Sequence, residues 1–286
     1  MLSFHFEPFY FPGLAVVPLQ TTVESQYVRV SIYPVFYKHF IIEWSVPAKW
    51  GAVKFNVYKS NMESPNSFEK INPVPILGNF YKDPTTMDFS KFKDSYYKVE
   101  VTLPDGRSIV SRTYTWENVR TNFVEIRAVE IRRRESLLLD KFTGISTLVF
   151  RRKTFGKRCT ECWDTRTERC IKDNCQTCLG TSFEGGYFEG FPTKVQYNPT
   201  PNDAVLGYQG VVEANEIPAW TIDKPTINVF DLVLRVPDSK LYRASQVQST
   251  ELQTITVRQM LTLTEMGKDS VEYQLAYRLL PTEYQT

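Results

Sequence analysis

The sequence has few of the residues and motifs on which common enzymes depend. Its 286 residues include only two histidines, His5 and His39, so general-base chemistry has few candidates. It contains no glycine-rich phosphate loop, no nucleophile elbow, and no His-x-x-x-His or His-Glu pair. We therefore expect a protein that is not an enzyme. A pair of acids of the glycosidase type can escape notice in one sequence, and a deep pocket with two converging carboxylates would reveal it.

Long apolar runs are absent as well. No stretch approaches the roughly 18 uninterrupted apolar residues that a transmembrane helix needs. Residues 1–13 lack the basic start and the continuous apolar core of a signal peptide. The 34 Lys and Arg nearly balance the 32 Asp and Glu, so the net charge of +2 gives no global reason to expect nucleic acid or a membrane as partner. We expect a soluble chain that is made in a cytoplasm.

Aromatic residues, by contrast, are plentiful. The chain has 16 Tyr and 19 Phe, which suit strands better than helices, and its length predicts two or three units of about 100 residues each. Runs that mix β-branched and aromatic residues predict strands at 27–33, 40–46, 55–58, 96–103 and 108–116. The last two flank Pro104-Asp105-Gly106, which is typical of a hairpin turn because proline presets φ and glycine permits positive φ. This density of strands predicts a β-sandwich.

Three aromatic residues in these runs form a pattern. Trp44 ends the run Phe-Ile-Ile-Glu-Trp, Tyr58 ends Phe-Asn-Val-Tyr, and Tyr97 begins Tyr-Lys-Val-Glu-Val. The pattern resembles a fibronectin type III domain, in which the second, third and sixth strands carry such residues. The resemblance implies that the three side chains fill the space between two sheets. Another kind of β-sandwich would bury the same aromatic residues.

The periodicity changes between residues 118 and 142. Apolar residues there recur at three- and four-residue spacing, and Gly144 follows where a C-cap would lie. This pattern predicts one helix. Its run Arg132-Arg133-Arg134 lies within a turn of several glutamates, so we interpret it as a solvated face with ion pairs rather than as a phosphate-binding patch.

The remainder of the chain returns to short strand patterns. The predicted strands are 194–197, 209–213, 229–236, 240–248, 253–263 and 271–279. Pro237-Asp238-Ser239 predicts the turn of a hairpin between the third and fourth of them. A small antiparallel barrel or sheet fits this region.

All five cysteines lie within twenty residues of one another. Cys159 and Cys162 form one CxxC pair, Cys175 and Cys178 form a second, and Cys170 is left over. Four thiolates brought to one point are the ligand set of a closed structural zinc site, so we predict Zn²⁺ at Cys159, Cys162, Cys175 and Cys178. Three alternatives stay open but fit less well: a disulfide framework, a redox-active CxxC and an iron–sulfur cluster.

A zinc ribbon can also bind nucleic acid. The basic residues that precede the first pair, Arg151-Arg152-Lys153 and Lys157-Arg158, keep this alternative open. Against it, Trp163 is the only aromatic residue between the two pairs, and nearby acids dilute the charge. A metal that holds together a segment too small for its own core is the simpler hypothesis.

The tail of the second pair carries a more specific resemblance. Cys159-x-x-Cys162-Trp-Asp, followed by Cys175-x-x-Cys178-Leu-Gly-Thr-Ser-Phe-Glu-Gly-Gly-Tyr187, resembles a zinc-knuckle segment of structural proteins of tailed bacteriophages. After Phe230 the chain has an Asp-Leu-Val run, a Tyr-Arg-Ala-Ser-x-Val run and a later Gln-x-Leu-x-Leu run, and this region is similar to the small β-barrel of head-closure and neck proteins. These resemblances imply a virion protein of the neck, assembled in the host cytoplasm as a ring or in several copies, that contacts portal, adaptor or tail proteins. Baseplate and capsid-associated positions are the alternatives.

Three units result: 1–117, a fibronectin III-like β-sandwich; 118–192, a helix with the zinc-binding knuckle; and 193–286, a small β-barrel or sheet domain. The overall class is mainly β.

Overall fold

A computed structural model places most of the chain. It describes residues 23–36, 38–51, 54–62, 64, 67–85, 95–116, 123–172, 175–198, 205–207, 210–212, 216–252 and 254–280. His5 and the first 22 residues lie outside this part, as do residues 117–122 at the predicted start of the helix. The fold is mainly β, as predicted. Among the described residues, no helix combines the length and the apolar character needed to cross a membrane.

The N-terminal unit consists of two antiparallel sheets that share one core. One sheet has the order β1-β2-β5, and the other has the order β4-β3-β6-β7 with β8 also paired to β6. A short 3₁₀ turn, Val23–Tyr27, precedes β1, and another, Ala48–Trp50, precedes β3. The strands are β1 (Arg29–Val35), β2 (His39–Ser45), β3 (Lys54–Ser60), β4 (Glu69–Lys70), β5 (Phe80–Lys82), β6 (Tyr96–Thr102), β7 (Ser108–Val110) and β8 (Tyr114–Thr115).

Strand parity decides which of the predicted aromatic residues enter this core. Trp44 and Tyr97 are buried in it, as predicted. The prediction for Tyr58 is wrong: successive side chains of a strand point to opposite faces, and in β3 it is Phe55 and Val57 that face inward. Tyr58 lies on the outer face, where its hydroxyl donates to Glu100 at 2.8 Å.

The predicted hairpin around Pro104-Asp105-Gly106 is confirmed. Strands β6 and β7 pair antiparallel, and Gly106 takes a φ of +85°, a conformation that a residue with a Cβ rarely adopts. The turn is closed by the Gly106 N–H, which donates to the carbonyl of Leu103 at 3.0 Å.

Helix α1 (Phe123–Leu138) lies within the predicted range and continues into a π-helical turn (Leu139–Thr143). Gly144 is the C-cap, as predicted, and its N–H donates to the carbonyl of Leu139. Its backbone is extended rather than left-handed, and a Cβ there would lie 2.4 Å from that carbonyl oxygen. Of the arginine run, Arg133 and Arg134 pair with Glu130 on the surface, as interpreted. Arg132 instead reaches the barrel, where it pairs with Asp223 and donates to the carbonyl of Thr256.

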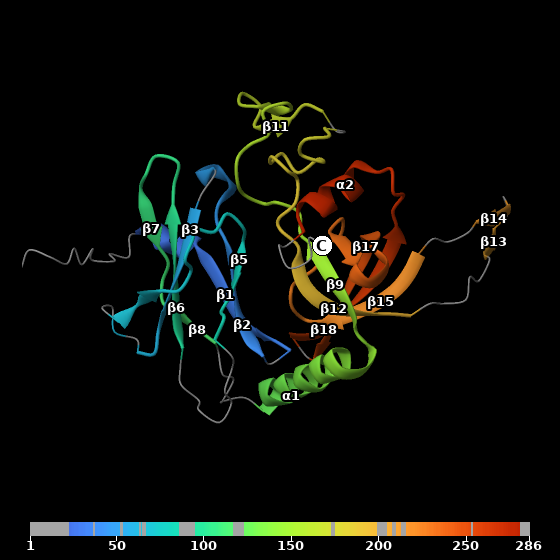
Figure 1. Cartoon of the computed structure of the whole chain (residues 1–286), viewed down its shortest axis with the longest axis horizontal. Helices are drawn as coiled ribbons and strands as arrows, with labels where there is room; N and C mark the ends of the chain where they lie inside the picture. The colour runs from blue at the N-terminus through green and yellow to red at the C-terminus, as the bar shows by residue number, and fades with distance from the viewer. Residues whose placement is uncertain are drawn as a thin grey trace, which may run out of the picture.

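The C-terminal part forms the predicted small barrel, closed by six antiparallel strands in the order β12-β15-β18-β17-β16-β9 (Figure 1). A 3₁₀ turn (Val236–Asp238) joins β16 to β17 at the predicted Pro-Asp-Ser hairpin. The barrel takes β9 from the range 118–192 that the sequence analysis assigned to the helix and knuckle. The strands are β9 (Ile145–Phe150), β12 (Phe191–Tyr197), β15 (Glu216–Ile222), β16 (Leu232–Arg235), β17 (Lys240–Leu252) and β18 (Ile255–Glu265); outside it, β13 (Val205–Gly207) pairs with β14 (Gly210–Val212).

The prediction of a strand at 271–279 is wrong. These residues form helix α2 (Val271–Arg278). The structure therefore has a second α-helix, whereas the sequence predicted only the central one. Ser270 is its N-cap and accepts a hydrogen bond from the Tyr273 N–H at 3.3 Å. Tyr273 and Ala276 are three residues apart on one helical face, and both are buried against the barrel cluster that contains Leu241. Capping and helical spacing therefore outweigh the strand propensity of Val and Tyr.

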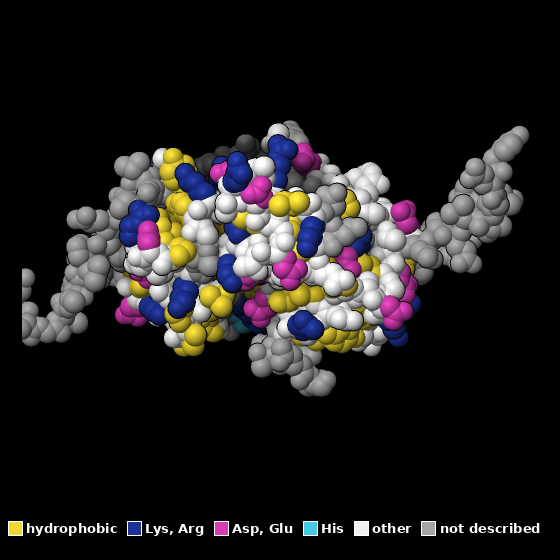
Figure 2. Space-filling view, turned by 90° about the horizontal axis from the view of Figure 1, so that it is seen from above, with side chains coloured by type: hydrophobic (Ala, Val, Ile, Leu, Met, Phe, Trp, Pro, Cys, Tyr) yellow, Lys and Arg dark blue, Asp and Glu magenta, His cyan; other side chains and the backbone are white. Residues whose placement is uncertain are grey.

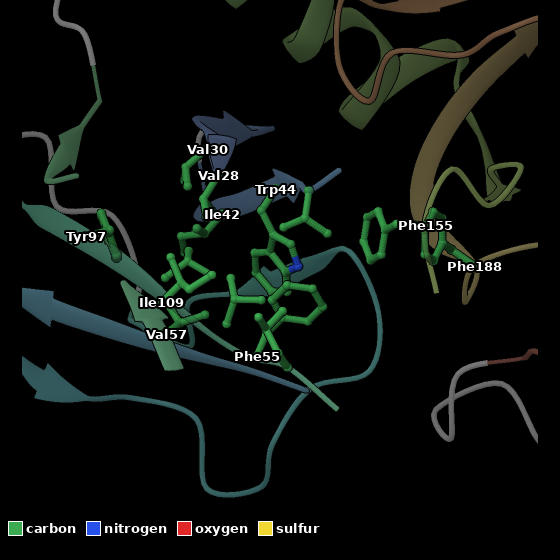
Figure 3. Close-up of a cluster of buried hydrophobic side chains, with 14 residues drawn as sticks. Val28, Val30, Ile42, Trp44, Phe55, Val57, Tyr97, Ile109, Phe155 and Phe188 are labelled. Atoms are coloured by element: carbon green, nitrogen blue, oxygen red, sulfur yellow. The ribbon is translucent and has the colours of Figure 1, made fainter. Parts of the chain in front are cut away.

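Aromatic residues join the two β units. Phe155 and Phe188 are buried in the core of the N-terminal unit, although they belong to the segment that leaves the barrel after β9 and returns before β12. Figure 3 shows the two rings side by side, pointing toward Trp44 and Phe55. The ring centroids of Phe55 and Phe155 are 5.7 Å apart, and those of Phe155 and Phe188 are 4.9 Å apart. The core of the N-terminal unit is therefore completed by two residues from the segment between β9 and β12.

Candidate metal centre

The knuckle, residues 151–190, is an elaborated connection between neighbouring barrel strands. Strands β9 and β12 pair antiparallel, and their ladder continues beyond the barrel through the bridges Arg152 to Tyr187 and Arg158 to Phe183. The Cys159 N–H donates to the carbonyl of Ser182 at 3.1 Å, which brings the start of the first CxxC pair to the end of the second. In Figure 1 this segment lies above the barrel, with β11 (Arg169–Cys170) at its tip.

The four predicted ligands meet inside the knuckle. The sulfur atoms of Cys159, Cys162, Cys175 and Cys178 all lie within 4.8 Å of one another, and each residue is at most 3% exposed. The Sγ atoms of Cys159 and Cys175 are 3.7 Å apart, and those of Cys162 and Cys178 are 3.3 Å apart. Tetrahedral Zn–S bonds of about 2.3 Å would place sulfurs about 3.8 Å apart, which is close to these separations. The four residues can hold a metal ion.

Backbone N–H groups favour the thiolate form of one member of the second pair, Cys175. Burial by itself would raise the pKa of the Cys175 thiol, but hydrogen bonds from the backbone N–H groups of Cys178 and Thr177 outweigh it and lower that pKa. Burial raises the pKa of the Cys178 thiol. A metal ion would bind both sulfur atoms as thiolates in place of their protons, because the thiolate is the ligating form.

Glycines shape the exit from the second pair, as the sequence suggested. Gly180, Gly185 and Gly186 all have positive φ, between +65° and +77°. A Cβ on Gly186 would lie 3.1 Å from the carbonyl oxygen of Cys178, so a side chain there would crowd the ligand turn. The Gly-Gly step thus lets the returning chain pass close to the cysteines.

Cys170, the fifth cysteine, is bonded to one of the four predicted ligands. It forms a disulfide with Cys162, a predicted ligand, and the two Cα atoms are 4.9 Å apart. A disulfide framework was the less favoured alternative for these cysteines, and their spacing did not point to Cys162 as the partner of Cys170. A short hairpin does so, since β10 (Trp163–Asp164) pairs with β11 (Arg169–Cys170). Asp164 closes that turn through the Arg166 N–H and the Thr167 hydroxyl, and its Asp-x-x-Thr pattern was the available signal.

The basic residues near the knuckle make contacts within the chain. Arg151 is buried and pairs with Glu43 of β2, and Arg158 lies between two rings, 3.8 Å from the centroid of Trp163 and 4.4 Å from that of Phe183. Arg152 donates to the carbonyl of Gly180, Lys153 donates to that of Glu184, and Lys157 pairs with the Glu184 carboxylate. These five side chains anchor the knuckle. The sequence alone did not show the Arg158 stack, because Phe183 lies 25 residues further along the chain.

Two cavities of the described part contain a single acid each. One, of about 360 Å³, lies between β1, β8, α1 and the end of β15, and its acid is Asp223, whose Oδ2 is 3.1 Å from Nε of Arg132. The other, of about 560 Å³, is lined by β3 and β4 residues and contains Glu69. Neither shows the two converging carboxylates that the glycosidase alternative requires. His39 is half-buried on β2 and lines neither cavity.

Comparison with known proteins adds little. No family model and no curated protein matches the chain. Among solved structures, a pectate lyase from Pectobacterium carotovorum is similar with a TM-score of 0.28 and 17% sequence identity. The similarity covers 34% of this chain and 29% of the lyase, and at that TM-score it carries no argument about fold or activity.

Proposed function

We propose that this chain is a structural component of a tailed-phage virion, located in the neck at the head–tail connector, and that it acts through protein–protein contacts. One observation carries the proposal: the segment from Cys159 to Tyr187, which resembles the knuckle of such proteins, stands on two adjacent strands of a closed six-stranded barrel. A ring or several copies of the chain would contact portal, adaptor or tail proteins.

The metal in this proposal is Zn²⁺ with a structural role. Four thiolates fill every position of a tetrahedral site, so no position is left for water or substrate. The buried sulfur cluster supports a closed site of this kind. Iron in the same thiolates is the competing occupant, and it would be recognised by its visible absorption.

The N-terminal unit is proposed to be a fibronectin III-like module displayed outward from the barrel. The sheet orders β1-β2-β5 and β4-β3-β6-β7, and the burial of Trp44 and Tyr97 between the sheets, support this.

Nucleic acid is the weaker partner. The five basic residues of the knuckle already contact the chain itself. Figure 2, which views the molecule from the knuckle side, shows Lys and Arg scattered among Asp and Glu rather than gathered into one basic area. A nucleic-acid interface would need such an area, because phosphate contacts supply most of the affinity.

Purified particles from infected cells test the proposal. We expect quantitative mass spectrometry to find the chain in several copies per particle, and a symmetric electron-microscopy map to place it in the neck. Density at the baseplate or on the capsid would reject the neck position. A chain that is abundant in the lysate but absent from particles would reject the virion role, and salt-dependent retention on DNA would then favour the zinc-ribbon alternative.

A further inference from the structure

The metal centre has five sulfur atoms, one more than a tetrahedral ion can bind. Cys170 lies on the far strand of the β10–β11 hairpin, opposite Trp163, the residue that follows the first CxxC pair. The Ile171 N–H donates to the carbonyl of Cys162 at 2.8 Å, so the backbone holds the two cysteines next to each other. Their Cα separation of 4.9 Å is within the usual range for a disulfide. The Sγ of Cys170 is also 4.0 Å from that of Cys178.

We propose that Cys162 and Cys170 form a thiol–disulfide switch that controls whether the metal is held. Cys162 has one sulfur and two competing uses: as a thiolate it completes the four-ligand site, and in the disulfide it cannot. This inference rests on the metal centre of the proposed function and not on the place of the protein in a particle.

The chemistry balances with an oxidising disulfide such as glutathione disulfide. Cys170 is half-buried whereas Cys162 is 2% exposed, so the oxidant meets Cys170 first. The Cys170 thiol loses its proton, attacks the oxidant and forms a mixed disulfide, which releases one glutathione thiolate. The Cys162 thiolate leaves the metal and attacks the Cys170 sulfur, which releases the second glutathione thiolate. Two cysteine thiolates lose two electrons in total, the oxidant gains them, and the metal departs from the three remaining ligands.

The switch is local. The base of the knuckle is held by the Arg152–Tyr187 and Arg158–Phe183 bridges and by the rings of Phe155 and Phe188, none of which involves a sulfur. Oxidation should therefore release the metal and loosen residues 159–178 while the barrel and the N-terminal unit stay folded.

The test uses the full chain, reduced and loaded with Zn²⁺, as wild type and as Cys170→Ser. Serine keeps the size of the side chain, and equal zinc content of the two reduced proteins is the control for folding. Glutathione disulfide is added, and released zinc is followed with a chromogenic chelator. We expect wild type to release its zinc, peptide mapping to identify a Cys162–Cys170 disulfide, and the variant to release zinc about tenfold more slowly. Dithiothreitol with added zinc should restore the wild-type site.

Three outcomes overturn the switch, and they separate it from the metal centre. Equal release rates, or a disulfide that pairs Cys162 with another cysteine, reject the switch alone. A Cys162→Ser variant that keeps a full equivalent of zinc also rejects it, because Cys162 would then not be an essential ligand. A reduced wild-type chain that binds no metal rejects the metal centre together with the switch.

Discussion

The barrel and the knuckle adjoin each other but are stabilised by different means. The barrel buries aliphatic and aromatic side chains from six strands, among them Val149, Leu232 and Leu263. The knuckle has almost no such core: the buried cluster among its ligands contains cysteines alone. A segment of this size cannot bury enough apolar surface to fold by itself, so it depends on a metal ion inside and on neighbouring units outside. The folded state of the knuckle thus depends on a bound metal ion, whereas that of the barrel depends on its own apolar core.

The largest expected effect is the loss of a ligand. Cys175→Ser should abolish stoichiometric zinc binding and open residues 159–178 to protease, because three thiolates leave the site incomplete. The barrel should keep its cooperative unfolding transition. Metal analysis and limited proteolysis check both expectations, and Gln176→Ser, a change at an exposed neighbour, is the matched control. An unchanged digestion pattern in Cys175→Ser would remove the contrast between the two regions.

The second-largest effect concerns the aromatic joint, by which we mean Phe155 and Phe188 in the core of the N-terminal unit. Phe155 is 2% exposed and packs between Phe55 and Phe188, so Phe155→Ala should cost about 3–5 kcal/mol of the free energy of unfolding of the N-terminal unit. Urea denaturation followed by tryptophan fluorescence would measure this loss, since Trp44 lies in the same cluster. Phe142, which is 77% exposed, supplies the control: Phe142→Ala should change the free energy by less than about 0.5 kcal/mol. Equal effects would mean that the joint is dispensable.

A buried carboxyl gives the barrel side a distinct pH dependence. Burial raises the pKa of Asp231 from 3.8 to about 6, although the backbone N–H groups of Arg152 and Asn228 favour the ionised form. The folded protein then binds more protons than the unfolded chain between about pH 4 and 6, so this residue stabilises less as pH rises through that window, by about 3 kcal/mol in all. The free energy of unfolding of wild type minus that of Asp231→Asn should fall by this amount from pH 3 to pH 7.

Asp83 of the N-terminal unit should show the opposite sign. Burial opposes its ionisation, but the Lys59 ammonium, the Thr85 N–H and the Tyr97 hydroxyl outweigh burial and lower its pKa. Its stabilising contribution is therefore present above the ordinary pKa and is lost as pH falls below it. Asp83→Asn should be most destabilised relative to wild type at neutral pH. If both variants followed the same pH trend, the assignment of opposite environments would be wrong.

The smallest effect concerns a helix cap. Ser270→Ala removes the acceptor for the Tyr273 N–H and should cost about 1 kcal/mol. Thermal unfolding of the barrel would report it as a shift of a few degrees. Asp269→Ala, an exposed change one residue earlier, should leave the midpoint nearly unchanged.

Local signals explain which parts of the fold could be predicted. The Pro104-Asp105-Gly106 hairpin and the two CxxC pairs are encoded over a few residues, and the structure forms the first and brings the second together. The helix Val271–Arg278 was missed because Val and Tyr favour strands. The Ser270 cap is a local signal for it, whereas the face that contacts Leu241 depends on the finished barrel.

Long-range contacts account for the other misses. That Tyr58 faces outward follows from the parity of β3, which only its pairing with β6 reveals. The burial of Phe155 and Phe188 depends on a core assembled from residues more than 40 positions earlier in the chain, and no local pattern marks it. Likewise, the choice of Cys162 as the partner of Cys170 required the β10–β11 register.

The aromatic joint also bears on when the N-terminal unit can complete its core during synthesis. Ribosomes make the N-terminal strands first, yet the core between them is filled from positions 155 and 188. Until residue 188 emerges, Trp44 and Phe55 face a gap that later chain must occupy, so the nascent first unit should remain loosely closed and exposed to chaperones. A fragment that ends at residue 122 would represent the N-terminal unit before Phe155 and Phe188 have been made. Its hydrogen exchange around β2 and β3 should be faster than in the whole chain.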